Sequence, residues 1–254
     1  MRAPNLREMT ISAGLGLGLA TLAIAGLFAG AQRRLLYHPT HNTPRTLLQP
    51  WTENGVVIGY ARVVPRPKTV WLMTHGNAGQ AANRDYVLPC LSPADSLYVL
   101  EYPGYGARPG KPSRETFDAA AIGAYRSLRA EHPGVPVCVV GESIGSGPAC
   151  ALASDAGPPD KIVLVVPFDT LARVAAEHVP GLLVRLLLSD RWDNVRALRG
   201  YRGKVQIFGA RDDRVIPVVH AERLAASLPS ARFTLIPGGH NDWASGGSVR
   251  ITND

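Results

Sequence analysis

The chain has 254 residues, and 46% of them are hydrophobic, so it can form an α/β domain with a substantial core, and global disorder is excluded. Its net charge of +7 comes mostly from scattered arginines, without a basic run interleaved with aromatic residues. We therefore exclude nucleic acid as a partner, whereas an anionic membrane remains compatible with this charge. Cys90, Cys138 and Cys150 form no CxxC pair and no metal-type cluster, and we expect them to be small core residues.

An uncharged stretch of 21 residues, from Ile11 to Ala31, lies near the N-terminus. At about 1.5 Å per residue, a helix of this length reaches roughly 30 Å, the hydrocarbon thickness of a bilayer. Arg33 and Arg34 follow it, and two arginines precede it. We predict that residues 1–34 are an uncleaved, single-pass membrane anchor. A cleaved signal peptide, which would give a secreted protein, is the alternative, and arginines on both flanks leave the side of the membrane undetermined.

Residues 35–254 are predicted to form one domain. Three prolines within residues 32–50 indicate an extended linker, after which two short strands are expected over Val56–Tyr60 and Ala61–Val64. From Thr69 onward, apolar β-branched runs alternate with helical patterns, which predicts an α/β fold with a mostly parallel central sheet and helices on both faces. The further strands are expected over Val70–Thr74, Leu97–Glu101, Val135–Val140, Ile162–Val166, Val205–Phe208 and Phe233–Ile236. The helices are expected over Ala81–Leu88, Ser113–Glu131, Gly147–Asp155, Thr170–His178 and His220–Ser227.

The longest interval between predicted strands runs from Pro167 to Arg202 and contains the leucine-rich stretch Leu182–Leu188. Such a segment is compatible with a cover over a binding site and equally with a packed helix. The sequence leaves both interpretations open.

One stretch carries the strongest chemical signal. The buried-strand pattern of Val135–Val140 leads into Gly141-Glu142-Ser143-Ile144-Gly145, which fits G-x-S-x-G. In this motif a strand turns sharply into a helix and presents a serine hydroxyl at the apex, and the glycines avoid collisions around the strained central residue. A short pattern of common residues is weak by itself, but the strand–turn–helix context favours Ser143 as a nucleophile over an ordinary glycine-rich turn.

A serine nucleophile needs a base and a carboxylate that orients the base. His240 follows two glycines after the last predicted strand, and Asp212 and Asp213 follow the strand before it. The carboxyl ends of parallel strands converge at one edge of a sheet, so these residues can meet Ser143 although they are distant in sequence. We predict Ser143, Asp212 and His240 as the catalytic residues, with Asp213 kept as the alternative acid.

Catalysis of acyl transfer also needs two backbone N–H groups that face the developing oxyanion. We expect one from Ile144, directly after the nucleophile. The other should come from the loop His75-Gly76-Asn77-Ala78-Gly79 after the first core strand, with Asn77 as the donor. His75 is interpreted as a structural residue that fixes this loop and not as a second base. No metal or cofactor site is expected from the sequence.

Together these motifs resemble the α/β-hydrolase superfamily, and within it the membrane-anchored serine hydrolases with an N-terminal hydrophobic segment and little or no cap domain. The segments that carry the resemblance are HGNAG, EYPGYG, GESIGSG, VPFDTL, GARDDRVIP and GGHND, in this order, with QRRLLYHP and LLLSDRWDN. The resemblance implies the α/β-hydrolase fold, the Ser143–Asp212–His240 triad and the Asn77/Ile144 oxyanion hole. The additional acidic residue in GARDDRVIP is a departure that keeps Asp213 under consideration.

The resulting hypothesis is a serine hydrolase that cleaves carboxylic ester or thioester bonds through an acyl-enzyme. The anchor and the Leu182–Leu188 stretch favour lipid-like or acylated substrates, including acylated proteins. The alternatives are a membrane-tethered interaction protein without catalytic activity on the same scaffold, and a serine peptidase, which differs only in the leaving group.

Overall fold

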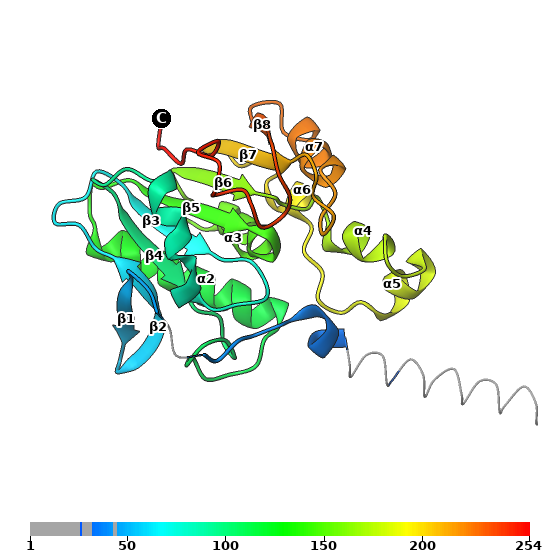
Figure 1. Cartoon of the computed structure of the whole chain (residues 1–254), viewed down its shortest axis with the longest axis horizontal. Coiled ribbons are helices and arrows are strands. Elements are labelled where there is room, and N and C mark those ends of the chain that lie inside the picture. The colour runs from blue at the N-terminus through cyan, green and yellow to red at the C-terminus, as the bar shows by residue number, and fades with distance from the viewer. Residues whose placement is uncertain (1–25, 27–31, 43–44) are drawn as a thin grey trace, which may run out of the picture.

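In the computed structural model, which describes residues 26, 32–42 and 45–254, eight strands form one sheet in the order β1-β2-β4-β3-β5-β6-β7-β8 (Figure 1). β1 pairs with β2 and β2 with β4 in antiparallel fashion, and all other pairs are parallel. The predicted mostly parallel α/β architecture is thereby confirmed. The strands are β1 (Gln49–Glu53), β2 (Val56–Arg62), β3 (Val70–Thr74), β4 (Ser96–Leu100), β5 (Val137–Glu142), β6 (Lys161–Val165), β7 (Lys204–Ala210) and β8 (Arg232–Ile236).

The central strands are buried on both faces, as expected for a parallel sheet covered on each side. Along β3, Val70 and Leu72 join one core cluster, whereas Trp71 and Met73 join another, so alternate side chains face opposite sides of the sheet. The helical elements are η1 (Ala81–Cys90), α2 (Arg114–Glu131), η2 (Ser143–Gly145), α3 (Ser146–Ala151), η3 (Leu152–Ser154), α4 (Leu171–Ala176), α5 (Gly181–Leu187), α6 (Asn194–Ala197) and α7 (Val219–Ala226).

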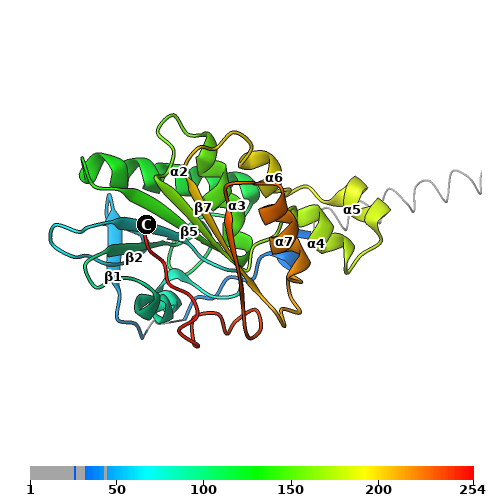
Figure 2. The ribbon, with the colours of Figure 1, turned by 90° about the horizontal axis from the view of Figure 1, so that it is seen from above.

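The two faces of the sheet are covered differently (Figure 2). The helices α2, α3 and α7 contribute to the first core cluster, through residues such as Phe117, Ala149 and Leu224. The opposite face is covered by η1, which is a 3₁₀ helix and not the α-helix expected there, and by the segment after β8, through Trp243 and Ile251. The predicted helices on both faces are therefore present.

The interpretation of residues 32–50 as an extended linker is wrong. Residues 32–36 form a short helix, and β1 pairs with β2. Tyr37 and Leu48 are each only 3% exposed, and the Tyr37 ring lies 5.1 Å from that of Phe117. Burial of these two side chains holds the segment against the domain although it contains prolines. The two strands expected over residues 56–64 are one strand, β2, with a register shift opposite Trp51 and Thr52.

The predicted anchor, residues 11–31, lies outside the described residues except for residue 26. Within the part of the chain that is described, none of the helices has the length and apolar character needed to cross a membrane.

The register of the sheet brings the candidate residues to one edge. Thr74 at the end of β3 is paired with Gly141 of β5, and Ala210 at the end of β7 is paired with Ile236 of β8. The loops that follow these strands therefore emerge side by side at the carboxyl edge, which is where ligands bind in open α/β sheets.

Candidate active site

Ser143 occupies the apex of the turn between β5 and α3. Its φ of 53° lies in the left-handed region that a non-glycine residue rarely adopts. A Cβ atom on Gly145 would lie 2.0 Å from the Thr74 carbonyl oxygen, and one on Gly141 would lie 2.7 Å from the Ala149 Cβ. Glycine is thus required at both positions by close contact of the elbow with β3 and α3, as the G-x-S-x-G pattern predicts.

His240 lies between Ser143 and a carboxylate. Its Nε2 is 2.8 Å from Ser143 Oγ, and its Nδ1 is 2.7 Å from Asp213 Oδ2. The side chains of His240 and Asp213 are 10% and 1% exposed, so this hydrogen-bonded row is largely shielded from water. The arrangement has the connectivity of a nucleophile, a base and an orienting acid.

The predicted assignment of Asp212 as the acid is wrong, because the carboxylate at His240 is that of Asp213. Asp212 has an exposed side chain, and its N–H donates to the Gly238 carbonyl. The other oxygen of Asp213 accepts hydrogen bonds from the N–H groups of Val215 and Ile216, both at 2.8 Å, which fixes its orientation. The expectation failed because β7 continues to Ala210, two residues beyond the predicted end at Phe208, and the turn shifts accordingly.

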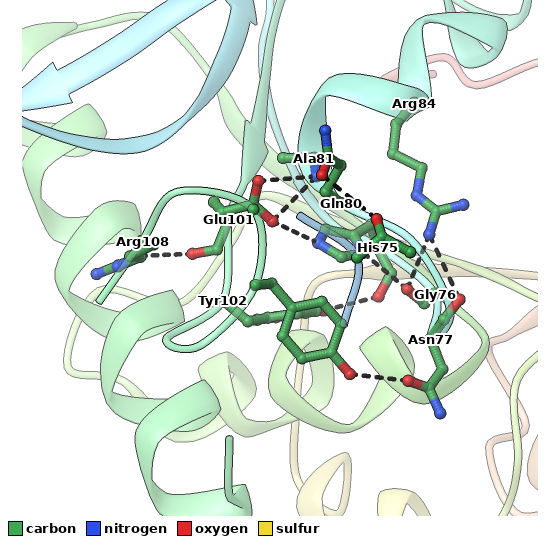
Figure 3. A network of polar contacts seen from close by, with 12 residues as sticks. His75, Gly76, Asn77, Gln80, Ala81, Arg84, Glu101, Tyr102 and Arg108 are labelled. Atoms are coloured by element: carbon green, nitrogen blue, oxygen red, sulfur yellow. Dashed lines mark hydrogen bonds and ion pairs between the residues drawn. The ribbon is translucent and has the colours of Figure 1, made fainter. Parts of the chain in front are cut away.

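The predicted oxyanion donors, Asn77 and Ile144, both line a cavity with Ser143. The N–H of Asn77 belongs to the same peptide unit as the Gly76 carbonyl, which accepts a hydrogen bond of 3.0 Å from Arg84 Nη2 (Figure 3). His75 Nδ1 lies 2.7 Å from the same oxygen. Because N–H and C=O point in opposite directions across a trans peptide, these contacts orient the Asn77 N–H away from Arg84.

The Asn77 side chain fastens the same loop to other parts of the chain. Its Oδ1 accepts hydrogen bonds from the His38 N–H at 2.9 Å and the Tyr105 hydroxyl at 2.8 Å, and its Nδ2 donates to the Leu36 carbonyl. The segment after the predicted anchor therefore supports the loop of residues 75–79 directly, which sequence patterns did not indicate.

Glu142, the residue before Ser143, joins three loops of the site. It accepts hydrogen bonds from the Gly76 N–H at 2.7 Å, the Tyr86 hydroxyl at 2.5 Å and the Trp243 indole N–H at 3.0 Å. Burial alone would raise the pKa of Glu142, but nearby Arg84 and these donors outweigh burial and hold it below its ordinary value. The ionised Glu142 thus connects the elbow with the loop of residues 75–79, with η1 and with the segment that follows His240.

Sequence reasoning missed the roles of Glu142 and Arg84. A charged residue next to the nucleophile, in an otherwise apolar strand and turn, was a signal for Glu142. Arg84 had no such signal, since only the fold brings η1 over the loop after β3.

His75 is fully buried, as expected for a residue that fixes the loop. Its Nε2 lies 3.5 Å from Glu101 Oε1, and Glu101 also accepts a hydrogen bond from the Ala81 N–H at 3.0 Å (Figure 3). Tyr102 donates to the His75 carbonyl at 2.8 Å and stacks on Phe117. The aromatic residues of the EYPGYG segment therefore pack the turn and support the loop.

Two cavities meet at Ser143, each of about 500 Å³. The first, here called the apolar cavity, extends from Ser143 between the helix of residues 32–36 and the segment that contains α4. Its apolar lining includes Leu36, Phe168, Leu171, Val174, Val179 and Leu188. The second is more polar and is lined by Asn77, Arg84, Tyr86, Glu142, His240 and Asn241, among others. A substrate with one apolar and one polar portion could place its reacting carbonyl between them.

Among the residues that the structure describes, no group of three or more His, Cys, Asp or Glu side chains is placed to hold a metal ion.

No family model matches the chain. Uncharacterized protein Rv2307c of Mycobacterium tuberculosis is 34% identical over 176 residues, which cover 67% of this chain and 62% of that protein. Alpha/beta hydrolase domain-containing protein aho-3 of Caenorhabditis elegans is 29% identical over 197 residues, which cover 74% of this chain and 57% of that protein. The chain thus spans about three fifths of the length of these relatives.

Among solved structures, the esterase Pf2001 of Pyrococcus furiosus superposes with a TM-score of 0.63, over 83% of this chain and 95% of its own, at 13% identity. The alpha/beta hydrolase GrgF of a Penicillium species gives a TM-score of 0.60, over 78% of this chain and 92% of its own, at 14% identity. At such low identity the likeness establishes the fold alone.

Proposed function

This chain has the α/β-hydrolase fold, and from that premise we propose that it is a serine hydrolase that cleaves carboxylic ester or thioester bonds through an acyl-enzyme. The observation that carries the proposal is the unbroken row of hydrogen bonds from Ser143 Oγ through His240 to Asp213. The strained backbone of Ser143 adds support, since strain at the apex of a strand–turn–helix elbow is typical of this nucleophile.

In the proposed mechanism His240 accepts the proton of Ser143 as Ser143 Oγ attacks the substrate carbonyl. Asp213 holds the imidazole in the tautomer with a proton on Nδ1 and stabilises the imidazolium that forms. The N–H groups of Asn77 and Ile144 stabilise the oxyanion. His240 then protonates the leaving alcohol or thiol, and in the second half it activates the water that releases the acid.

The proposed substrates are lipid-like or acylated molecules, including acylated proteins. The apolar cavity supports this choice, because Ser143 lines it and most of its other lining residues have apolar side chains that fit an acyl chain. We further propose that residues 11–31 anchor the protein in a membrane, on the strength of their uncharged sequence.

The test is hydrolysis of p-nitrophenyl esters from acetate to palmitate by wild type and by Ser143→Ala. We expect the wild type to prefer longer acyl chains to acetate, and the variant to lose several orders of magnitude in kcat. A serine-reactive fluorophosphonate should label only the wild type. Equal rates for the two proteins would remove Ser143 from the mechanism. If neither turnover nor labelling is observed, the interaction protein without catalytic activity becomes the better hypothesis.

A further inference from the structure

Four leucines with exposed side chains lie on two neighbouring helices, one of which lines the apolar cavity: Leu35, Leu182, Leu183 and Leu186, here called the leucine face. Their exposed fractions are 65%, 65%, 43% and 65%. Leu35 belongs to the helix of residues 32–36, and the other three belong to α5, in which Val184 is the buried residue. Single exposed leucines are ordinary, but several on two neighbouring helices indicate a surface that binds a lipid bilayer or another protein.

Hydrogen bonds hold the two helices together. The Ser189 N–H, two residues after α5, donates to Gln32 Oε1 at 2.8 Å. Arg33 Nε donates to Asp190 Oδ2 at 3.2 Å, and the Tyr37 hydroxyl donates to the same oxygen at 2.8 Å. The helix of residues 32–36 and α5 lie at the same end of the molecule in both views (Figures 1 and 2). The two helices that carry the leucine face are therefore neighbours, although they are about 150 residues apart in sequence.

We infer that the leucine face docks into the surface of an anionic lipid bilayer. The uncharged stretch of residues 11–31 ends one residue before Gln32, which is itself hydrogen-bonded beside α5. Leu35 comes four residues after the end of this stretch, and even a fully extended chain of four residues reaches only about 14 Å. The inference rests on the proposed membrane anchor, whose position would bring the leucine face to the lipid.

The charges around the leucine face are those expected of a surface that binds an anionic bilayer. Arg34, Arg185 and Arg191 are exposed and lie next to the leucines in sequence or fold, and Arg191 donates to the Arg185 carbonyl. Apolar side chains flanked by arginines are the pattern of helices that lie in the interface of an anionic membrane. The net charge of +7 acts in the same direction.

Docking in this way has a consequence for the substrate. Leu35 lines the apolar cavity together with Leu36 and Leu188, so the mouth of the cavity would face the acyl chains of the bilayer. A lipid acyl chain could then pass to Ser143 without crossing water. The leucine face would thus select substrates that reside in membranes.

The experiment uses the full chain reconstituted into vesicles of phosphatidylcholine and phosphatidylglycerol. A fluorescent NBD probe is attached at Leu186→Cys and, as a matched control, at Leu47→Cys. The three native cysteines are buried and should not compete for the label. Leu47 is 77% exposed and lies just before β1, at the opposite end of the sheet from α5 (Figure 1).

We expect lipids with a doxyl quencher in the acyl chain to quench the probe at position 186 about fivefold more strongly than the probe at position 47. Equal, weak quenching at both positions would overturn the inference. Protection of position 186 from aqueous iodide without quenching by lipid would also overturn the inference. A second copy of the chain, or its own residues 11–31, would then be what covers the leucine face.

A second measurement connects docking with substrate access. In Leu182→Ser/Leu186→Ser, hydrolysis of p-nitrophenyl palmitate in vesicles should fall about fivefold or more, while hydrolysis of soluble p-nitrophenyl acetate stays at the wild-type rate. An unchanged rate on the palmitate ester would overturn the role in substrate access. Absence of hydrolysis by the wild type would refute the proposed function alone, because quenching tests docking without turnover.

Discussion

At the residue scale, two adjacent aspartates after β7 differ in burial, in hydrogen bonding and in contact with His240. The Asp213 side chain is 1% exposed, receives two backbone hydrogen bonds and contacts His240, whereas Asp212 has an exposed side chain and contributes through its backbone N–H. A buried carboxylate facing Nδ1 stabilises the imidazolium form, and an exposed one at a distance does so weakly.

This difference provides a matched pair of variants. Asp213→Asn should reduce kcat on a p-nitrophenyl ester by about 10³–10⁴-fold, because the amide favours the wrong imidazole tautomer. Asp212→Asn should stay within about twofold of wild type, since a screened surface charge has little influence on the site. Steady-state kinetics of the wild type and the two variants measure kcat for each. The assignment fails if Asp212→Asn is the more damaged enzyme.

Arg84 and Glu142 act on the oxyanion loop from opposite ends of one residue, Gly76. Arg84 donates to the Gly76 carbonyl, Glu142 accepts from the Gly76 N–H, and the two side chains lie 3.9 Å apart. The guanidinium therefore orients and polarises the Gly76–Asn77 peptide unit, whose N–H is the proposed oxyanion donor. We assign Arg84 a positioning role and not a contact with the reacting atoms.

If this role is correct, Arg84→Met should lower kcat by about 10-fold or more and change KM little, because the oxyanion forms only in the transition state. Arg126→Met is the control, since Arg126 pairs with Asp155 at the surface, far from the loop. Thermal unfolding of both variants separates loss of fold from loss of orientation. A rise in KM at constant kcat would contradict the positioning role.

At the scale of elements, the elbow depends on contact between η2 and β3 at distances that only glycine allows. Thr74 Oγ1 donates to the Gly145 carbonyl at 2.8 Å, and a Cβ on Gly145 would lie 2.0 Å from the Thr74 carbonyl oxygen. Because that oxygen belongs to the backbone of a central strand, it has no room to retreat. The G-x-S-x-G pattern therefore reflects packing of the elbow on β3 as well as strain at Ser143.

Two glycine substitutions should consequently change the free energy of unfolding in opposite directions. Gly145→Ala should lower the free energy of unfolding by about 1–3 kcal/mol or more through overpacking. Gly123→Ala should raise it by about 0.5–1 kcal/mol, because Gly123 is exposed in the middle of α2 with nothing within 4 Å of an added Cβ. Urea unfolding of both variants at one pH gives the comparison. Equal effects would show that the contact at Gly145 is relieved elsewhere.

At the scale of the whole molecule, buried carboxylates connect stability to pH. Asp169 follows β6 and is fully buried between His220, whose Nδ1 is 2.8 Å from Oδ1, and Arg173. Burial would raise the pKa of Asp169, but the contacts with His220 and Arg173 and the Thr170 N–H outweigh burial, and the pKa is lowered. This cluster joins the start of α4 to α7 beside the apolar cavity.

A lowered pKa in the folded state stabilises the protein above the unfolded pKa of aspartate, about 4, and this contribution disappears as the pH falls through the folded pKa. The free energy of unfolding should therefore decrease as the pH is lowered from about 5 to 3. In Asp169→Asn it should be lower at pH 7 by about 1–3 kcal/mol and decrease less on acidification. Asp212→Asn, which removes an exposed charge, is the control. Parallel pH profiles for wild type and Asp169→Asn would exclude this cluster as a source of the dependence.

The sequence by itself determined the features that depend on local pattern. Apolar β-branched runs predicted the parallel strands, because a strand buried on both faces must be apolar throughout. Ser113 predicted the start of α2, where it forms a reciprocal cap with Thr116. The glycines around Ser143 predicted the elbow, and two glycines after the last strand singled out His240, because close backbone contacts restrict the residue type at each position.

The tertiary structure decided what depends on the exact ends of elements and on segments distant in sequence. Asp213 and not Asp212 lies at His240 because β7 ends two residues beyond its predicted end, and a shift of one residue in a turn exchanges a buried side chain for an exposed one. Tyr37 attached the supposed linker to the domain through contacts with Phe117 and Asp190. Arg84 and Glu142 meet at Gly76 from two other elements, and the leucine face unites residues 35 and 182–186. No local pattern encodes such meetings, since they arise only when the whole sheet has set the positions of its loops.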